Sequence, residues 1–268
     1  MDSSLSAVDV TDLGTEKLAA RVEGAIGWLV FDNPARRNAL SNDMQRALPI
    51  AFDAFQRDDA VRVVVMRGAG EKAFVSGADI SEFDDDALPG SGATGARRDD
   101  LVPLEKPVVA MIHGYCIGGG VAVSLGADIR IAADDAQFAI PAGRLGVGYP
   151  FFGVKALVDL VGPAHASEIL FSARRFDAGE ALQMGLVNRV VPKAGLEDAV
   201  RELAGQIAEN APLSLRASKL AIAQVLRDPA SRDLDRVNAL VAECFESDDY
   251  QEGVRAFLEK RPPKFQGR

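Results

Sequence analysis

Hydrophobic and polar positions repeat along the chain in a way that predicts strands alternating with helices. β-branched and apolar runs bounded by Gly, Asn, Asp or Pro predict strands at residues 19–31, 61–66, 108–112, 128–140 and 186–191, with two short strands in the first and the fourth of these. Helical periods fall between several of the runs. This order predicts an α/β fold with largely parallel strand pairing and helices on both faces of the sheet.

Capping residues mark where two of the helices are expected to begin. Ser41 is suited to cap one helix, although Pro49 inside it predicts a kink or a later start. Asp177 and Glu180 form a capping-box pattern for another. These helices are expected at residues 41–56 and 177–185, and further ones at residues 151–161 and 164–173.

The chain from residue 195 onward contains helical periods and no strand pattern. Four helices are expected, at residues 196–209, 213–227, 231–246 and 249–260. We therefore predict a frayed tail at residues 1–17, an α/β core at residues 18–194, and a C-terminal helical region at residues 195–268 that packs on the core or on another subunit. Residues 84–100, rich in Asp, Gly and Ala, are expected to form a mobile surface segment.

Composition and charge narrow the classes of function. The 268 residues are 48% hydrophobic, and a net charge of −9 with Lys and Arg spread along the chain argues against a nucleic-acid partner. Cys116 and Cys244 lie far apart in apolar surroundings, so buried thiols are expected rather than a disulfide or a metal site. The polar residues 1–15 do not resemble a signal peptide, and no apolar run is long enough to span a bilayer. The cytoplasm is therefore the expected compartment, without a membrane partner.

Residues 107–127 (PVVAMIHGYCIGGGVAVSLGA) are the most informative stretch. An apolar strand breaks at Gly114, and Gly118-Gly119-Gly120 leads into a buried helix. A strand, a glycine turn and a helix aim free backbone N–H groups and a helix N-terminus at one point, which attracts a phosphate or an oxyanion. Three consecutive glycines are also typical of close packing or of a turn.

Two further segments contain small residues at places where a backbone can approach a ligand. In residues 72–83 (KAFVSGADISEF) these are Ser76, Gly77 and Ala78. Residues 141–150 (PAGRLGVGYP) are expected to form a glycine-rich loop directly after a strand, where α/β folds place ligands.

Three segments, in this order, carry a resemblance to one family. They are KAFVSGADISEF, HGYCIGGGVAVSLGADIRIAADDAQF and FDAGEALQMGLVNRVVP. Residues 22–191 resemble the crotonase superfamily (enoyl-CoA hydratase/isomerase-like proteins), and the end of the chain, KRPPKFQGR, is similar to that family as well. The resemblance implies the ββα-superhelix of the ClpP/crotonase fold, an acyl-CoA thioester as substrate, and homotrimers or dimers of trimers. It implies no cofactor beyond the coenzyme A of that substrate.

The resemblance also implies roles for individual residues. The backbone N–H groups of Ala78 and Gly119 would form an oxyanion hole for the thioester carbonyl. Arg36 and Arg37 lie where the family contacts the adenine and phosphates of CoA, and Lys260 or Lys264 would add charge; surface solvation is the alternative for each. The positions expected to bind substrate or CoA are Arg36, Arg37, Ala39, Ser76, Asp79, Ile80, Tyr115, Gly118, Pro141 and Ala142.

Two departures from the family's pattern bear on the reaction. Ala122 and Ala142 stand where family hydratases carry their two catalytic glutamates, so water addition by that route should fail. The stretch PAGRLGVGY resembles the P-A-x-L-G-V-x-Y loop of methylmalonyl-CoA decarboxylase, in which Tyr149 matches the active-site tyrosine. That enzyme carries a histidine at the position of Ala78. A tyrosine of the core or of the pocket wall is the alternative for Tyr149.

These features favour decarboxylation of a small malonyl-type CoA, because the oxyanion hole holds the enolate and no base is needed to start the reaction. One alternative is an enoyl-CoA isomerase or an atypical enoyl-CoA hydratase with Asp79 or Glu82 as its acid, although Asp79 is also suited to cap a helix. Another is a catalytically silent homologue that binds acyl-CoA or a partner protein.

Overall fold

The computed structural model describes residues 8–9, 13–79, 82 and 104–268. The predicted CoA contact at Ile80 and the predicted mobile segment at residues 84–100 lie outside the described residues. Within the predicted tail, strand β1 (Val8–Asp9) pairs with the next strand, so that part of the tail is ordered on the sheet rather than frayed.

The larger of two sheets has seven strands in the order β1-β2-β3-β4-β6-β8-β11. β2 and β3 form an antiparallel hairpin, and the neighbours from β3 to β11 are all parallel. The α/β fold with mostly parallel pairing is thus confirmed. The bounds of these strands are β2 Leu18–Glu23, β3 Ile26–Phe31, β4 Val63–Gly68, β6 Val108–Ile112, β8 Ile129–Ala133 and β11 Arg189–Val191.

The smaller sheet is built from four short strands, three of which directly follow strands of the larger sheet, while the fourth, β10, follows a helix. Its order is β10-β9-β7-β5, and β5, β7 and β9 are parallel to one another. The bounds are β5 Ala73–Val75, β7 Tyr115–Ile117, β9 Gln137–Ala139 and β10 Phe176–Asp177. The sequence pattern predicted a break at Gly114 but not strand β7 after it. Gly114 adopts φ of +55°, which turns the chain from β6 into β7.

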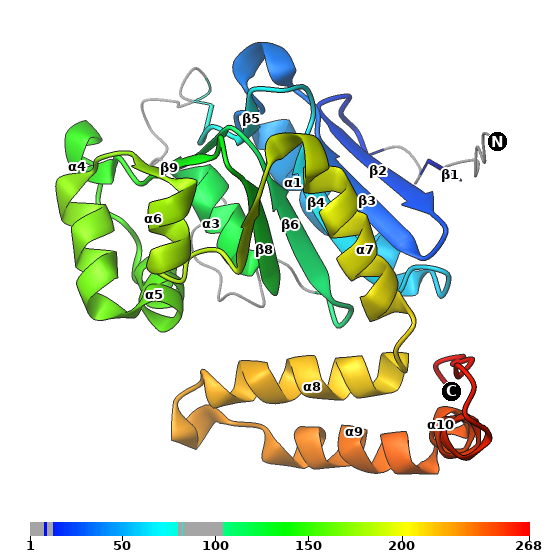
Figure 1. Ribbon diagram of the computed structural model, residues 1–268. Coiled ribbons are helices and arrows are strands. Elements are labelled where there is room, and N and C mark those ends of the chain that lie inside the picture. Colours follow the sequence, from blue (N-terminus) through cyan, green and yellow to red (C-terminus); the bar gives the residue numbers. More distant parts are fainter. Residues whose placement is uncertain (1–7, 10–12, 80–81, 83–103) are drawn as a thin grey trace.

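Two apolar layers cover the two faces of the larger sheet. On one face, Val63, Val65 and Val109 pack against helix α7 (Leu196–Ala208). On the other face, Val64, Met66 and Ile112 share a core with α1 (Asn42–Arg57), α3 (Gly119–Gly126) and the smaller sheet. Each fully buried side chain of this size contributes about 1.5–3 kcal/mol. Because α7 is a layer of this core, the first helix of the predicted C-terminal region packs directly on the sheet (Figure 1).

The helix ends follow the capping signals in the sequence. Ser41 accepts a hydrogen bond from the Met44 N–H, and α1 starts at Asn42 and continues through Pro49, so the later start suggested by that proline is wrong. Asp177 and Glu180 form the predicted capping box at the start of α6. The other helices of the core are α4 (Ala142–Leu145), α5 (Phe151–Ser172) and α6 (Ala178–Gln183), and α5 is interrupted at Gly162, between the two helices predicted there.

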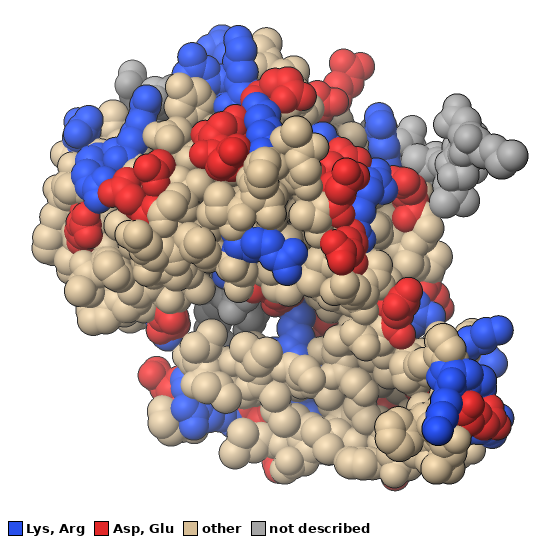
Figure 2. Space-filling model, in the orientation of Figure 1, with Lys and Arg blue, Asp and Glu red and all other residues tan. Residues whose placement is uncertain are grey.

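The last three helices lie below the sheets as a separate layer (Figure 1). They are α8 (Pro212–Val225), α9 (Leu234–Glu246) and α10 (Asp248–Glu259), close to the predicted ranges. α8 and α9 pack on each other, and Figure 2 shows a hollow between them and the body of the molecule. Lys219 on α8 bridges the two parts through a 2.9 Å ion pair with Asp128.

The structure also bears on the predictions that the cysteines are buried and that no segment spans a membrane. Cys116 is fully buried as predicted, but Cys244 is only half-buried, and both are free thiols. Among the helices of the described residues, none combines the length and the apolar character needed to cross a bilayer.

Candidate functional site

The Ala78 backbone is held by a single bridge to Leu40. The Leu40 N–H donates to the Gly77 carbonyl at 2.8 Å, and the Asp79 N–H donates to the Leu40 carbonyl at 2.9 Å. Because this parallel bridge uses the residues on either side of Ala78, the N–H of Ala78 itself points away from Leu40. Gly77 reaches this geometry with φ of +118°, which favours glycine.

Gly119, the other predicted donor, is the first residue of α3 and lies beside Ala78. A Cβ atom at Gly119 would stand 3.4 Å from the Ala78 nitrogen and 3.2 Å from Leu40 Cδ1. The first N–H groups of a helix have no acceptor within it, so the Gly119 N–H is available to a ligand. The structure therefore brings the two predicted donors together, 41 positions apart in the sequence.

Close packing also explains one glycine of the triplet. A Cβ atom at Gly120 would lie 2.0 Å from the Val75 carbonyl oxygen, so α3 approaches β5 more closely than any side chain allows. Close packing therefore explains Gly120, whereas Gly119 is the glycine beside the Ala78 nitrogen. Gly118 precedes them as the N-cap, with φ of +52°.

Asn38, a residue that the sequence analysis did not single out, ties the segment with the arginines to the segment with Ala78. It is fully buried, and its Nδ2 donates to the carbonyls of Ala69 and Ala73 at 3.0 and 2.8 Å. Its Oδ1 accepts from the Asn33 N–H at 3.0 Å. Its φ of +57° is one that asparagine tolerates better than most residues. The signal available in the sequence was the asparagine itself, directly after Arg36 and Arg37.

Two segments that contain predicted CoA contacts, residues 36–40 and residues 76–79, lie side by side. The Ser76 N–H donates to the Arg37 carbonyl at 3.1 Å, and Ser76 Oγ donates to the Arg36 carbonyl at 3.3 Å. Ala39 is buried, while the side chains of Arg36 and Arg37 are exposed. Residues 36–40 and 76–79 therefore form one continuous edge that leads to Ala78.

Tyr115 extends this edge onto β7 and lies beneath two guanidinium groups. The ring centroid is 5.2 Å from Arg37 Cζ and 5.3 Å from Arg175 Cζ, which is within cation–π range. Arg175 directly precedes β10, and the sequence analysis did not propose it. Only the pairing of β10 with β9 places it here, so local sequence carried no signal for it.

The loop after β9 lies next to the glycine turn. Pro141 Cδ lies 4.0 Å from where a Gly118 Cβ atom would stand, so Pro141 and Gly118 are neighbours. The segment predicted as a glycine-rich loop contains one helical turn, α4 (Ala142–Leu145), which is followed by Gly146 with φ of +67°. A left-handed glycine after a short helix is a common way to end it, and it accounts for this turn.

A family model described as enoyl-CoA hydratase/isomerase matches residues 21–268 of the chain. This chain is a member of the enoyl-CoA hydratase/isomerase family. The short-chain-enoyl-CoA hydratase of Clostridium acetobutylicum is 36% identical over 89% of this chain and 93% of its own length. The carnitinyl-CoA dehydratase of Proteus mirabilis is 35% identical over 95% of this chain and 100% of its own.

A solved structure shows that the shared fold extends over nearly the whole chain. An enoyl-CoA hydratase/carnithine racemase from Magnetospirillum magneticum superposes with a TM-score of 0.85 at 34% identity, over 97% of each chain. The crotonase-like fold expected from the sequence motifs is therefore confirmed, together with the C-terminal helices that belong to it.

The two alanines that stand where family hydratases are expected to carry catalytic glutamates lie on α3 and α4. Ala122 is in the first turns of α3, and Ala142 starts α4. Methyl groups at these positions neither accept nor donate a proton. Of the alternative acids, Glu82 is engaged at the start of α1, where its carboxylate accepts from the Asn42 N–H at 2.6 Å and pairs with Lys17. The Asp79 N–H holds the Leu40 bridge.

Tyr149 is partly buried against the core and stays protonated at neutral pH. Its ring lies against Gly153 on α5, where a Cβ atom would come within 2.6 Å of Cε1. Burial raises the pKa of Tyr149 to about 12, and the Cys116 thiol nearby adds to this shift. The phenol is therefore a neutral hydrogen-bond donor rather than a phenolate.

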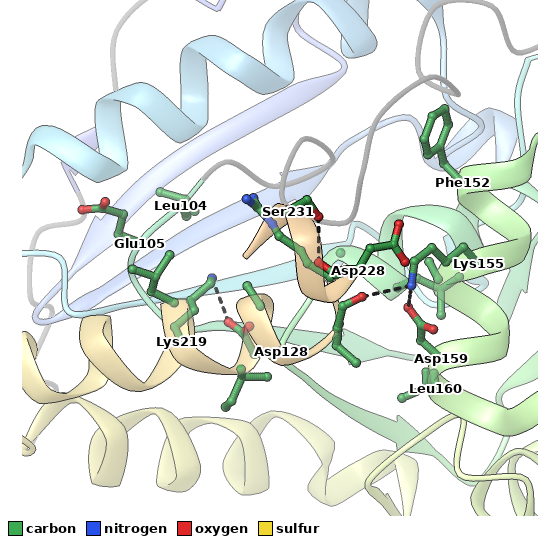
Figure 3. A pocket seen from close by; sticks show the side chains of 18 of the residues that line it. Leu104, Glu105, Asp128, Phe152, Lys155, Asp159, Leu160, Lys219, Asp228 and Ser231 are labelled. Atoms are coloured by element: carbon green, nitrogen blue, oxygen red, sulfur yellow. Dashed lines mark hydrogen bonds and ion pairs between the residues drawn. The ribbon is translucent and has the colours of Figure 1, made fainter. Parts of the chain in front are cut away.

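The protein also has a cavity that was not predicted from the sequence. It encloses about 650 Å³ between the core and α8, with Leu125 at the C-terminal end of α3 and Phe152 on α5 in its wall (Figure 3). Lys219 pairs with Asp128 at 2.9 Å, and Lys155 pairs with Asp159 at 2.6 Å. It lies at the opposite end of α3 from Gly119, so it is distinct from the donor pair. Within the described residues, no group of three or more His, Cys, Asp and Glu side chains is arranged to bind a metal ion.

Proposed function

We propose that this chain acts on an acyl-CoA thioester, that the N–H groups of Ala78 and Gly119 hold the thioester oxygen, and that the reaction is decarboxylation of a small malonyl-type CoA. The observation that carries the proposal is the approach of these two backbone donors, with a 3.4 Å contact between the Gly119 Cβ position and the Ala78 nitrogen. Each such donor is worth about 2.7–4 kcal/mol where an oxyanion develops.

The proposed reaction begins without a base. The bond between the α-carbon and the carboxylate breaks, carbon dioxide leaves, and the electron pair forms an enolate whose oxygen accepts the two hydrogen bonds. A proton then moves to the α-carbon and restores the thioester. Tyr149, as a neutral phenol, is a suitable donor for this proton, with water as the alternative. The two alanines, Ala122 and Ala142, are compatible with this sequence of steps.

A second candidate is hydration or dehydration of an enoyl thioester, because relatives of about 35% identity carry hydratase and dehydratase names. That reaction must move a proton and add or remove water at adjacent carbons, and positions 122 and 142 offer only methyl groups. Asp79, which directly follows Ala78 in the chain, is a candidate acid for this chemistry. A silent homologue that binds acyl-CoA without turnover is the third candidate.

Self-association is part of the proposal, because α9 and α10 expose large apolar side chains. Phe245 is 63% exposed, Phe257 83% and Leu258 74%. Exposed apolar groups of this size mark protein contacts, and a trimer or a dimer of trimers would cover them. Sedimentation velocity would test this: a monomer at micromolar concentration would contradict it.

Product analysis by mass spectrometry tests the reaction itself. The purified chain is incubated separately with methylmalonyl-CoA, malonyl-CoA and crotonyl-CoA. We expect loss of carbon dioxide from a malonyl-type thioester and no hydration of crotonyl-CoA. Rapid hydration without carbon dioxide release would favour the second candidate, and binding of all three thioesters without turnover would favour the third.

A further inference from the structure

Three connections that lead from the larger sheet into the smaller sheet meet at one ion pair. Strands β4, β6 and β8 are parallel neighbours, so their carboxyl ends lie along the same edge of the sheet. Residues 69–72, 113–114 and 134–136 follow these strands and lead into β5, β7 and β9. The ion pair is formed by an Asp135 carboxylate oxygen and Lys193 Nζ, 2.9 Å apart.

Asp135 connects the third of these segments to the second. Its Oδ1 accepts a hydrogen bond from the Gly114 N–H at 3.1 Å. At Gly114 the chain turns from β6 into β7, and a Cβ atom there would lie 2.1 Å from the Lys72 carbonyl oxygen, which only glycine avoids. The Gly114 carbonyl in turn accepts from the Gln137 N–H at 2.8 Å. The tightest turn of the smaller sheet is therefore bonded to Asp135.

Lys193, which directly follows β11, connects the first segment to the third. Its Nζ donates to the Glu71 carbonyl at 2.6 Å and to Asp135 Oδ2 at 2.9 Å. Burial raises the pKa of Asp135, but the hydrogen bonds from Lys193 and from the Gly114 N–H outweigh it and hold that pKa below its ordinary value. The hydrogen bond to Asp135 raises the pKa of Lys193. Both groups are therefore charged at neutral pH.

The three strands that start at this ion pair lead to the candidate site. Ala78 follows the end of β5 by three residues, Gly119 follows the end of β7 by two, and Pro141 follows the end of β9 by two. β5, β7 and β9 are parallel and each has three residues, so each spans about 10 Å. The ion pair thus lies at one end of the smaller sheet and the two backbone donors at the other.

We propose that Asp135 and Lys193 are positioning residues, whose ion pair fixes the connections at the start of β5, β7 and β9 and thereby sets the spacing of the Ala78 and Gly119 N–H groups. This inference rests on the proposed donor role of those two groups. Asp135 and Lys193 act through Gly114 and Glu71 and transfer no proton. A misplacement of about 1 Å at reacting groups can cost roughly 10²-fold in rate, so a clamp at this distance is able to control activity.

Two lysines of the chain form a matched pair for the test. Lys155 Nζ, like Lys193 Nζ, binds one carboxylate, that of Asp159 at 2.6 Å, and one backbone carbonyl, that of Leu226 at 3.1 Å. Their side chains are 37% and 33% exposed. Lys155→Gln is therefore the control for Lys193→Gln, because an ion pair with a structural role alone would affect stability in both variants and kcat in neither.

Steady-state kinetics with the turned-over thioester measure the effect on the donors. In Lys193→Gln we expect kcat to fall roughly 10- to 100-fold, with KM and the affinity for free CoA within threefold of wild type. Lys193→Arg keeps the charge and should recover most of this loss, and Lys155→Gln should keep the wild-type kcat. A kcat within threefold of wild type in folded Lys193→Gln would overturn the proposal.

The partner substitution tests whether the two residues act as a unit. Asp135→Asn removes the ion pair and keeps an oxygen for the Gly114 N–H, so its loss of kcat should resemble that of Lys193→Gln. The double variant should lose little more than either single variant, because the interaction is already absent. Multiplied losses in the double variant would contradict a shared role. If Asp135→Asn does not fold, the comparison of Lys193→Gln with Lys193→Arg decides.

Hydrogen–deuterium exchange tests the spacing without requiring turnover. Amides in residues 72–78 and 113–119 should exchange faster in Lys193→Gln than in wild type or Lys155→Gln, while amides of α1 should be unchanged. Unchanged exchange in both segments would overturn the proposal. If wild type turns over a thioester and Lys193→Gln does so equally well, the positioning role is wrong and the proposed reaction stands. If no thioester is turned over, the proposed reaction is wrong, and faster or unchanged exchange alone supports or overturns the clamp.

Discussion

Asn38 Nδ2 donates a 2.8 Å hydrogen bond to the Ala73 carbonyl, and this bond joins the arginine-bearing segment to the strand that precedes Ala78. Asn38 is completely buried, and its side chain satisfies two carbonyls and one N–H. These side-chain bonds add to the backbone bonds from Ser76 to Arg37 and from Leu40 to Gly77, which connect the same segments. The geometry of the donor pair therefore depends in part on a side chain that forms no hydrogen bond with either donor. Asn38 is in this sense a positioning residue.

The first prediction concerns Asn38→Ala. The substitution leaves the buried Ala73 carbonyl, the partly buried Ala69 carbonyl and the Asn33 N–H without their partner, so we expect the free energy of unfolding to fall by about 2–4 kcal/mol. Urea denaturation at constant protein concentration measures this. Asn33→Ala is the control, since Asn33 uses only its backbone in this contact. A decrease of less than 1 kcal/mol for Asn38→Ala would contradict the positioning role.

The second prediction separates two adjacent glycines. Gly120→Ala places a Cβ atom 2.0 Å from a backbone oxygen, so we expect strong destabilisation or failure to fold. In Gly119→Ala the new Cβ atom lies 3.2 Å from Leu40 Cδ1, 3.4 Å from the Ala78 nitrogen and 3.5 Å from the Gly77 carbonyl carbon, and Leu40 can move. It should therefore fold with near-normal stability.

The same Gly119→Ala variant should still lose activity, because its methyl group crowds the space in front of the Ala78 N–H. We expect kcat/KM to fall roughly 10²–10³-fold, as when one oxyanion donor is removed. Thermal denaturation and steady-state kinetics on one preparation measure both effects. Normal activity in a folded Gly119→Ala variant would argue against the donor role of this pair.

The third prediction concerns pH. His113 is 4% exposed, and burial, together with Lys193 and Arg67, lowers its pKa from 6.5, while Asp135 and the Gly70 carbonyl act in the other direction. The unfolded chain therefore binds this proton at a higher pH than the folded chain does. Stability should fall as pH drops below about 6.5 and stop falling once the folded-state pKa is passed. His113→Gln should make the unfolding free energy less dependent on pH in this window, and an unchanged slope would contradict it.

The fourth prediction concerns Tyr149→Phe, which keeps the ring beside Gly153 and removes the phenol. If Tyr149 delivers the proton to the enolate carbon, kcat should fall by roughly 10²–10⁴-fold with KM little changed. A kcat within a factor of three of wild type would assign proton delivery to water and leave Tyr149 as a wall of the core.

Local patterns in the sequence were sufficient for most elements of the fold. Ser41, Asp177 and Glu180 cap the helices that they were expected to cap, since a cap is formed by neighbours in the chain. Strand β7 was missed because three residues after a glycine carry too little periodicity to distinguish a strand from a turn. Its partners β5 and β9 lie far away in the sequence.

In the candidate site, too, local motifs identified some residues, while the positions of others depend on contacts between distant segments. Ala78 and Gly119 lie in recognisable motifs, and the structure brings them together. The position of Arg175 depends on the pairing of β10 with β9, and the cavity beside α8 depends on how the C-terminal helices fold back. Both arise from contacts between distant segments, which no local pattern encodes.

The most direct test of the central claim is product analysis after incubation with methylmalonyl-CoA in heavy water. The account predicts release of carbon dioxide and a product thioester with one deuterium on its α-carbon, because the enolate held by Ala78 and Gly119 takes its proton from solvent-exchanged groups. Unchanged methylmalonyl-CoA, with hydration of crotonyl-CoA by the same preparation, would contradict it.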